Sequence, residues 1–229
     1  MGERMERSGR GTSGRLLAFI AALAAALTAA PAGSQIRSGP GEASDPDTEA
    51  RAITQIVTAA EVADWARDRG DAEAMLVASR MMAEIHNRAR NGDAPFVTSS
   101  ILLDEAEALA ADDPYILQRI QRLRSPDKGV RSSPFGPGPI VLVRRLRARE
   151  TYSFTVEARR NEVLRVAAIG DGDTNIDLTI RDSAGVVVCN DGSRDHYPVC
   201  TLNRPQPGTL RVEVVNRGGV WSRVQILTN

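Results

Sequence analysis

Apolar residues recur with helical spacing between residues 48 and 125. Within 53–60 they fall at positions i, i+3, i+4 and i+7, so they share one face of a helix. Gly70 is placed to end this helix, and Asp71 to cap the next one. Equivalent stripes and caps follow, which predicts a small all-helical domain of about four helices arranged as two hairpins.

From residue 140 to residue 229 the pattern changes to alternation. Tyr152, Phe154 and Val156 share one face of an extended segment, and their polar neighbours share the other. The alternation recurs in four further groups, which are Leu164, Val166 and Ala168; Ile176, Leu178 and Ile180; Leu210, Val212 and Val214; and Val224 with Ile226. Turn-forming Asp, Asn, Gly and Pro residues separate the groups. Roughly seven to eight short strands of this kind predict an antiparallel β-sandwich or barrel.

Composition marks the boundaries between these segments. Residues 33–47 are rich in Gly, Pro, Ser and Asp, which is typical of a flexible lead-in. Residues 126–139 are dominated by Pro, Gly and Ser and are expected to be a linker. The predicted fold class is therefore α+β in separate domains, with a helical domain over 48–125 and a strand domain over 140–229.

The first 32 residues have the three parts of a secretory signal peptide. Arginines at positions 4, 7, 10 and 15 form a basic head, residues 16–27 are apolar, and Ala30-Pro31-Ala32 supplies the small residues of a cleavage site. The apolar run is shorter than the roughly 20 residues that cross a membrane. The sequence predicts Sec-type export of a periplasmic or secreted protein, with no membrane span after removal of residues 1–32. The alternative is an uncleaved anchor, because residues 16–35 carry no charge.

Charge and composition exclude several classes of protein. The 229 residues are 42% hydrophobic and 25% charged with a formal net charge of zero, which is typical of a globular protein and gives no electrostatic reason to expect a nucleic-acid partner. The chain has only two histidines and two cysteines. It contains no Gly-x-Ser-x-Gly, His-Glu-x-x-His, phosphate-loop or dinucleotide motif. We therefore predict that the protein is not an enzyme.

The two cysteines favour a disulfide. Cys189 and Cys200 flank a polar loop of an exported protein, where thiols oxidise. The alternative is a metal site that uses His196 as well, but such a set is one ligand short of a closed zinc site.

Acidic residues gather in two loops of the strand domain. We expect these loops to share one end of the sandwich, where they would supply oxygen ligands for calcium. The candidate ligands are Asp171, Asp173, Asp177, Asn190, Asp191 and Asp195. The alternative is that they stabilise turns by bonding their own backbone.

Arginines cluster around the first strands of this domain. They are Arg144, Arg145, Arg147, Arg149, Arg159 and Arg160. Such a patch would suit an anionic polymer of the cell envelope. The alternative is a solvated strand face without a partner.

Five stretches of the strand domain resemble the bacterial pre-peptidase C-terminal domain. They are Arg149–Phe154, Leu164–Ala167, Gly170–Ile180, Asp182–Asp191 and Gly208–Asn216. The resemblance covers residues 149–229 and implies a jelly-roll-like sandwich of a secreted bacterial protein. Members of this family commonly follow secreted proteases, and their relatives include the collagen-binding domains of clostridial collagenases, some of which bind calcium.

Together these observations predict an exported, non-catalytic binding or adhesion protein. Its sandwich would recognise a protein or a polysaccharide outside the cytoplasm, with calcium as the one cofactor considered. One alternative is a structural component of the cell envelope that self-assembles through the helical domain. A second alternative is an accessory module or regulator of a secreted peptidase.

Overall fold

The computed structural model describes residues 45–90, 94–125, 133–204 and 206–229. The predicted signal peptide over residues 1–32, most of the lead-in and the first half of the linker lie outside the described residues. The elements, in chain order, are α1 (Pro46–Arg69), α2 (Ala72–Ala83), β1 (Arg88–Ala89), α3 (Ser99–Ala110), α4 (Pro114–Arg124), β2 (Ile140–Leu146), β3 (Thr151–Ala158), β4 (Glu162–Gly170), β5 (Ile176–Arg181), β6 (Val187–Asp191), β7 (Val199–Arg204), β8 (Gly208–Asn216) and β9 (Ser222–Thr228).

The four helices begin and end where their capping residues lie. Gly70 ends α1 with φ at 65°, a left-handed conformation that glycine adopts without a Cβ clash. The Asp71 side chain caps α2 by accepting a hydrogen bond from the Ala74 amide at 3.0 Å. Thr98 and Asp113 cap α3 and α4 in the same way. The predicted helical segment over 48–125 is therefore confirmed as four helices.

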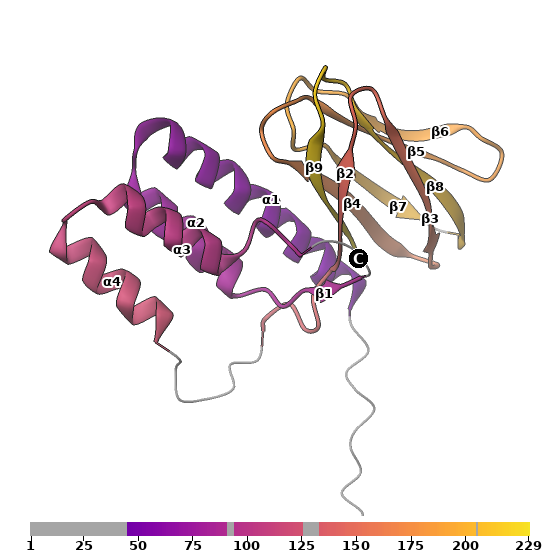
Figure 1. Ribbon diagram of the computed structural model, residues 1–229. Coiled ribbons are helices and arrows are strands. Elements are labelled where there is room, and N and C mark those ends of the chain that lie inside the picture. Colours follow the sequence, from indigo (N-terminus) through magenta and orange to yellow (C-terminus); the bar gives the residue numbers. More distant parts are fainter. Residues whose placement is uncertain (1–44, 91–93, 126–132, 205) are drawn as a thin grey trace, which may run out of the picture. The chain divides into compact units, whose positions relative to one another are not determined.

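Eight antiparallel strands, β2 to β9, form a sandwich of two sheets (Figure 1). Sheet A has the order β1-β2-β9-β4-β7, and sheet B has the order β3-β8-β5-β6. All five alternating groups that the sequence placed on inward faces contribute to the core between the sheets. The inward side chains of β8 and β5 are fully buried there, whereas Tyr152, Phe154 and Val156 of β3 are only partly buried.

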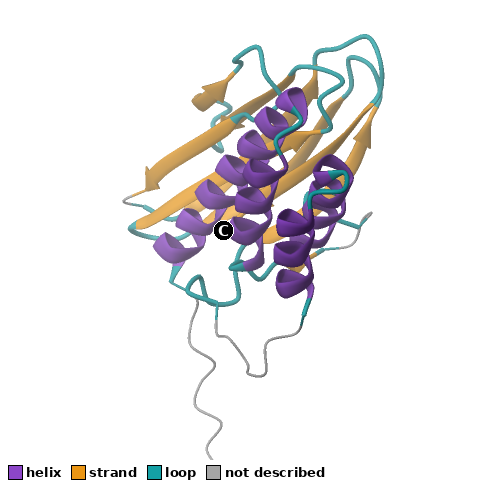
Figure 2. Ribbon diagram, turned by 90° about the vertical axis from the view of Figure 1, so that its left-hand side faces the viewer, coloured by secondary structure: helices purple, strands orange, loops and turns teal. Residues whose placement is uncertain are grey.

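The helices cover the outer face of sheet A (Figure 2). Val141, Ala167, Ile169 and Leu227 point away from the sandwich core and are buried among helical side chains. The part of sheet A formed by β2, β9 and β4 is therefore buried on both faces at these positions, while the outer face of sheet B is mostly polar. The helices and the sandwich belong to the same compact unit.

Hydrogen bonds from side chains reinforce this contact. Arg165 of β4 donates from Nη1 to the Ala50 carbonyl of α1 at 2.9 Å and to the Thr54 hydroxyl. Asn229 donates from Nδ2 to the Pro46 carbonyl at 2.9 Å, which ties the last residue to the start of α1. These bonds tie the first turns of α1 to β4 and to the end of the chain.

A two-residue strand, which the sequence pattern did not predict, joins the helical segment to sheet A. In β1, Arg88 and Ala89 pair in parallel with Ile140 and Val141 of β2. The chain comes close enough for this pairing because Gly138 has no side chain. A Cβ at that position would lie 1.6 Å from the His86 carbonyl oxygen.

Candidate functional site: the two edges of the sandwich

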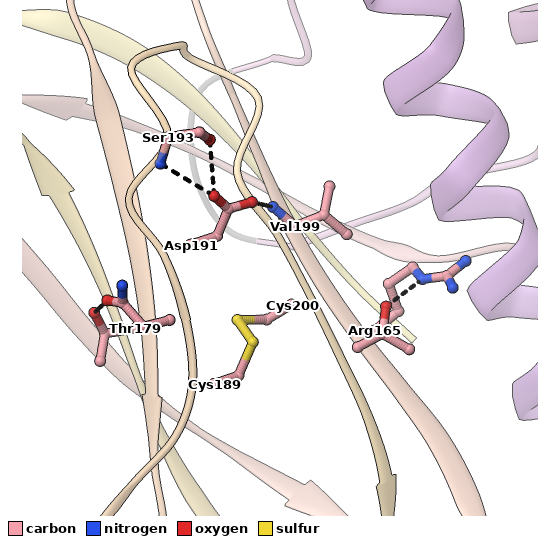
Figure 3. The surroundings of a disulfide bond; sticks show 9 residues. Arg165, Thr179, Cys189, Asp191, Ser193, Val199 and Cys200 are labelled. Atoms are coloured by element: carbon pink, nitrogen blue, oxygen red, sulfur yellow. Dashed lines mark hydrogen bonds between the residues drawn. A yellow bond between two sulfur atoms is a disulfide. The ribbon is translucent and has the colours of Figure 1, made fainter.

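One edge of the sandwich is closed by the predicted disulfide. Cys189 lies on β6, the edge strand of sheet B, and Cys200 lies on β7, the edge strand of sheet A. Their Cα atoms are 6.0 Å apart and their sulfurs are bonded (Figure 3). The disulfide therefore links the two sheets at one side, and we name this side, formed by β6 and β7, the closed edge.

Asp191 stabilises the loop that connects the two closed-edge strands. Its Oδ1 accepts from the Ser193 hydroxyl at 2.7 Å and from the Ser193 amide at 3.2 Å, and its Oδ2 accepts from the Val199 amide at 2.8 Å (Figure 3). Partial burial acts to raise the pKa of Asp191, but these three hydrogen bonds outweigh it, so the pKa lies below its ordinary value. The carboxylate is thus held in its charged form by the loop itself.

The other predicted calcium ligands also have partners of their own. The two acidic loops do meet at one end of the sandwich, where the Ile176 amide donates to the Asp195 carbonyl at 3.0 Å. Asp171 accepts from the Ser222 hydroxyl and the Arg223 amide, and Asp177 accepts from the Arg217 guanidinium. Asn190 accepts from the Thr179 hydroxyl, and Asp195 accepts from the Tyr197 amide. The Asp173 side chain is exposed.

These side chains do not converge on one point. Within the described ranges, no group of three His, Cys, Asp or Glu residues is arranged to hold a metal ion. The observed geometry is that of the turn-stabilising alternative, in which carboxylates accept from nearby amides. Calcium binding stays a prediction.

The loop between β6 and β7 also contacts the helices. His196 Nε2 lies 3.0 Å from Asp64 Oδ2 of α1, and the other oxygen of Asp64 accepts from Arg67 Nη1 at 2.7 Å. The Tyr197 hydroxyl donates to the Ala60 carbonyl at 3.4 Å, and burial together with the Asp64 carboxylate raises the pKa of this phenol. Asp64 Oδ2 therefore joins α1 to the loop, while Oδ1 is held by Arg67 of the same helix.

A pocket of about 330 Å³ adjoins this contact. Its polar lining consists of Asp64, Arg67, Glu105, Asp171, Tyr197 and Arg223. Arg67 pairs with Glu105 at 2.6 Å and with Asp64 at 2.7 Å, and Asp171 accepts from the Arg223 backbone amide at 2.7 Å. No serine, threonine or cysteine lines the pocket, which leaves it without a nucleophile of the kind used in acyl transfer.

The opposite side of the sandwich is open. A groove of about 650 Å³ runs between β3 of sheet B and the β1–β2 edge of sheet A. Its lining residues are Ala89, Arg90, Leu142, Arg144, Tyr152, Phe154 and Thr155. We name this surface the open-edge groove.

Aromatic and cationic groups dominate the open-edge groove. The rings of Tyr152 and Phe154 stack with centroids 5.7 Å apart, and the Arg144 guanidinium lies 5.3 Å from the Tyr152 ring. None of the lining residues is acidic. The groove therefore offers apolar contact and positive charge.

Comparison with known proteins locates the sandwich in a family. The family model of the bacterial pre-peptidase C-terminal domain matches residues 148–216. This segment is therefore similar to that family. The match spans β3 to β8, so β2, β9 and all four helices lie outside it.

Two solved structures illustrate the similarity. The pre-peptidase C-terminal domain of a collagenase from Bacillus anthracis has 8% identity and a TM-score of 0.35, covering 39% of this chain and 87% of that chain. PliG, a periplasmic inhibitor of g-type lysozyme from Aeromonas hydrophila, has 11% identity and a TM-score of 0.30, covering 40% of this chain and 86% of that chain. A search of curated proteins finds no match.

Sequence reasoning missed the open-edge groove. Alternation correctly predicts that Tyr152 and Phe154 face inward, but it gives them the same weight as the inward residues of β8. Only the strand order shows that β3 is an edge strand whose inward side chains stay partly exposed. The signal in the sequence was that, among the five alternating groups, both aromatic residues lie on β3.

Proposed function

We propose that this protein is an exported, non-catalytic accessory protein that binds a protein partner through its open-edge groove. The observation that carries the proposal is the groove itself, in which the stacked rings of Tyr152 and Phe154 lie beside Arg90 and Arg144. Aromatic residues and arginine are enriched where proteins bind one another.

The disulfide supports export, and the family match supports an accessory role. The Cys189–Cys200 disulfide is typical of proteins in an oxidising compartment such as the periplasm or the cell exterior. Among the described residues, no helix has the length and apolarity that a membrane span requires. The family match of residues 148–216 favours, as a second candidate, an accessory role beside a secreted peptidase.

Site-specific photo-crosslinking in the producing cells tests the proposal. A benzoylphenylalanine placed at Thr155, in the groove, is compared with one placed at Thr209, which is exposed on the neighbouring strand outside the groove. We expect an adduct with another protein from position 155 and none from position 209. Equal labelling from both positions would overturn the groove as the binding surface, and an adduct only with a second copy of this chain would favour self-assembly in the envelope.

A further inference from the structure

The outer side of β3 presents unused backbone hydrogen-bonding groups. The Asn216 amide donates to the Glu150 carbonyl at 3.0 Å, and the register pairs Thr151 with Val215. Because hydrogen-bonded and non-hydrogen-bonded pairs alternate in an antiparallel ladder, Tyr152 and Phe154 exchange hydrogen bonds with β8. The amides and carbonyls of Ser153 and Thr155 therefore point outward, and in the described part of the chain β3 pairs with β8 alone.

The apolar groups of the groove lie beside this row of backbone groups. Tyr152 and Phe154 point inward from β3, and Leu142 faces them from β2. An added strand would align its backbone with β3 and place alternate side chains over these three residues. It would extend the core at a side where the inward residues of β3 are only partly buried.

Arginine residues lie at both ends of β3. Arg147 and Arg149 lie in the turn before β3, and Arg159 and Arg160 lie in the turn after it. All four side chains are exposed. The eight residues of β3 extend about 26 Å, so a strand bound along it would pass arginines at each end. The arginine cluster of the sequence is thus divided between the two ends of one open edge.

We propose that the open-edge groove binds an extended acidic peptide segment of its partner by adding it as a new strand to β3. The proposal deepens the proposed function by naming how the partner binds. The favoured segment has apolar residues at alternate positions, to cover Tyr152 and Phe154, and carboxylates between them and at its ends. An anionic polysaccharide would meet the arginines but has no repeating amide and carbonyl groups to match those of Ser153 and Thr155.

Binding of a defined probe to the oxidised full chain tests the strand addition. The probe is a fluorescein-labelled peptide of alternating valine and glutamate, measured by fluorescence polarisation. One control peptide carries lysine in place of glutamate, and a second is N-methylated at alternate residues, which removes the amides that pair with β3. We expect binding of the first peptide only, weakening as salt screens the exposed charges.

Variants of β3 separate backbone pairing from side-chain contact. Thr155→Pro removes an outward amide without removing a hydrogen bond to β8, whereas Thr155→Val keeps the amide and changes the side chain to a similar extent. We expect at least tenfold weaker binding of the probe by Thr155→Pro and nearly unchanged binding by Thr155→Val. If Thr155→Pro fails to fold, the N-methylated peptide measures the same hydrogen bonds with the unaltered protein.

Charge is tested by a matched pair of reversals. Arg160→Glu lies at the end of β3, and Arg194→Glu makes the same change in the exposed loop of the closed edge. We expect about fivefold weaker binding for Arg160→Glu and no change for Arg194→Glu, since an exposed ion pair contributes modestly.

Equal binding of the N-methylated and unmethylated peptides would overturn strand addition. Binding of a polyanion such as heparin that competes with the peptide and is insensitive to Thr155→Pro would identify an anion-binding patch instead. If crosslinking at Thr155 finds a protein partner while the peptide does not bind, the proposed function stands and the strand-addition mode is overturned.

Discussion

The two edges of the sandwich are built in opposite ways. At the closed edge, a disulfide joins β6 to β7, and Asp191 fixes the connecting loop through three hydrogen bonds. At the open edge, β2 and β3 are joined by no such bond, and Tyr152 and Phe154 remain partly exposed between them. The same core therefore ends in a covalent link on one side and in an aromatic groove on the other.

This difference indicates how stability and binding are distributed. A sheet edge with unpaired backbone groups tends to recruit another strand, and proteins usually protect such edges. Here a disulfide links the two sheets at the closed edge. Under the proposed function, the open edge keeps its pairing groups for a partner.

Loss of the disulfide has the largest expected effect. We expect the Cys189→Ala/Cys200→Ala variant to be less stable by about 3 kcal/mol, because the bond closes a loop of 11 residues in the unfolded chain. The thermal midpoint should fall by roughly 10 °C. Calorimetry of the variant and of the reduced unaltered chain checks this. A reductant should leave the midpoint of the variant unchanged, and a midpoint equal to that of the oxidised chain would contradict the role of the disulfide.

Removal of the Asp191 carboxylate has the second largest expected effect on stability. We expect Asp191→Ala to cost about 2 kcal/mol at neutral pH, because two amides and a hydroxyl lose their acceptor. Urea unfolding measures the change, with Asp173→Ala as the control because that exposed side chain lies in the neighbouring acidic loop.

The effect of Asp191 should depend on pH. The pKa of Asp191 is lowered in the folded state, so the carboxylate stabilises the fold above its unfolded pKa of about 3.9. This stabilisation is lost as the pH falls through the lower folded pKa. The difference between the unaltered chain and Asp191→Ala should therefore shrink in acid, and a difference independent of pH would show that the charge is not involved.

Replacing Tyr152 at the open edge by threonine should lower the free energy of unfolding less than the same replacement of its buried neighbour Val214. Tyr152 is paired with Val214 of β8, which is fully buried. We expect Tyr152→Thr to lower the free energy of unfolding by about 1 kcal/mol and Val214→Thr by about 2 kcal/mol, since only the second change places a hydroxyl in the closed core. Urea unfolding of both variants compares them. A larger cost for Tyr152→Thr would mean that the open edge also stabilises the fold.

Calcium should have the smallest effect on the thermal midpoint of unfolding. The candidate carboxylates other than Asp173 already accept hydrogen bonds from neighbouring groups, and they do not converge. We expect thermal unfolding curves of the oxidised full chain in excess calcium and in excess EDTA to coincide. A binding site at 100 times its dissociation constant would add about 2.7 kcal/mol, which is easily measured. A rise in the midpoint of that size would establish the calcium site.

Local patterns predicted much of the fold. Gly70 and Asp71 mark the end of one helix and the start of the next because capping involves only residues a few positions apart. Alternation identified the inward residues of five strands, and the compartment implied by the N-terminal segment made the Cys189–Cys200 bond the expected state. Each of these inferences depends on neighbours in the chain or on the chemistry of a residue pair.

The burial of the second face of sheet A did not follow from the sequence. Ala167, Ile169 and Leu227 occupy positions that alternation assigns to the outer face, yet the helices bury them. The apolar run from Val166 to Ile169 was consistent with a strand buried on both faces. This run does not indicate which element packs on the outer face of sheet A.

What the sequence determined by itself is the identity of the elements, the direction in which most side chains point and the residues of the disulfide. The tertiary structure alone decided which strands lie at the edges, and thereby that Tyr152 and Phe154 border a groove while Val212 and Val214 lie in a closed core. The physical reason is that exposure at a sheet edge depends on strands far apart in the chain. The pattern within a single strand is the same whether or not another strand lies beside it.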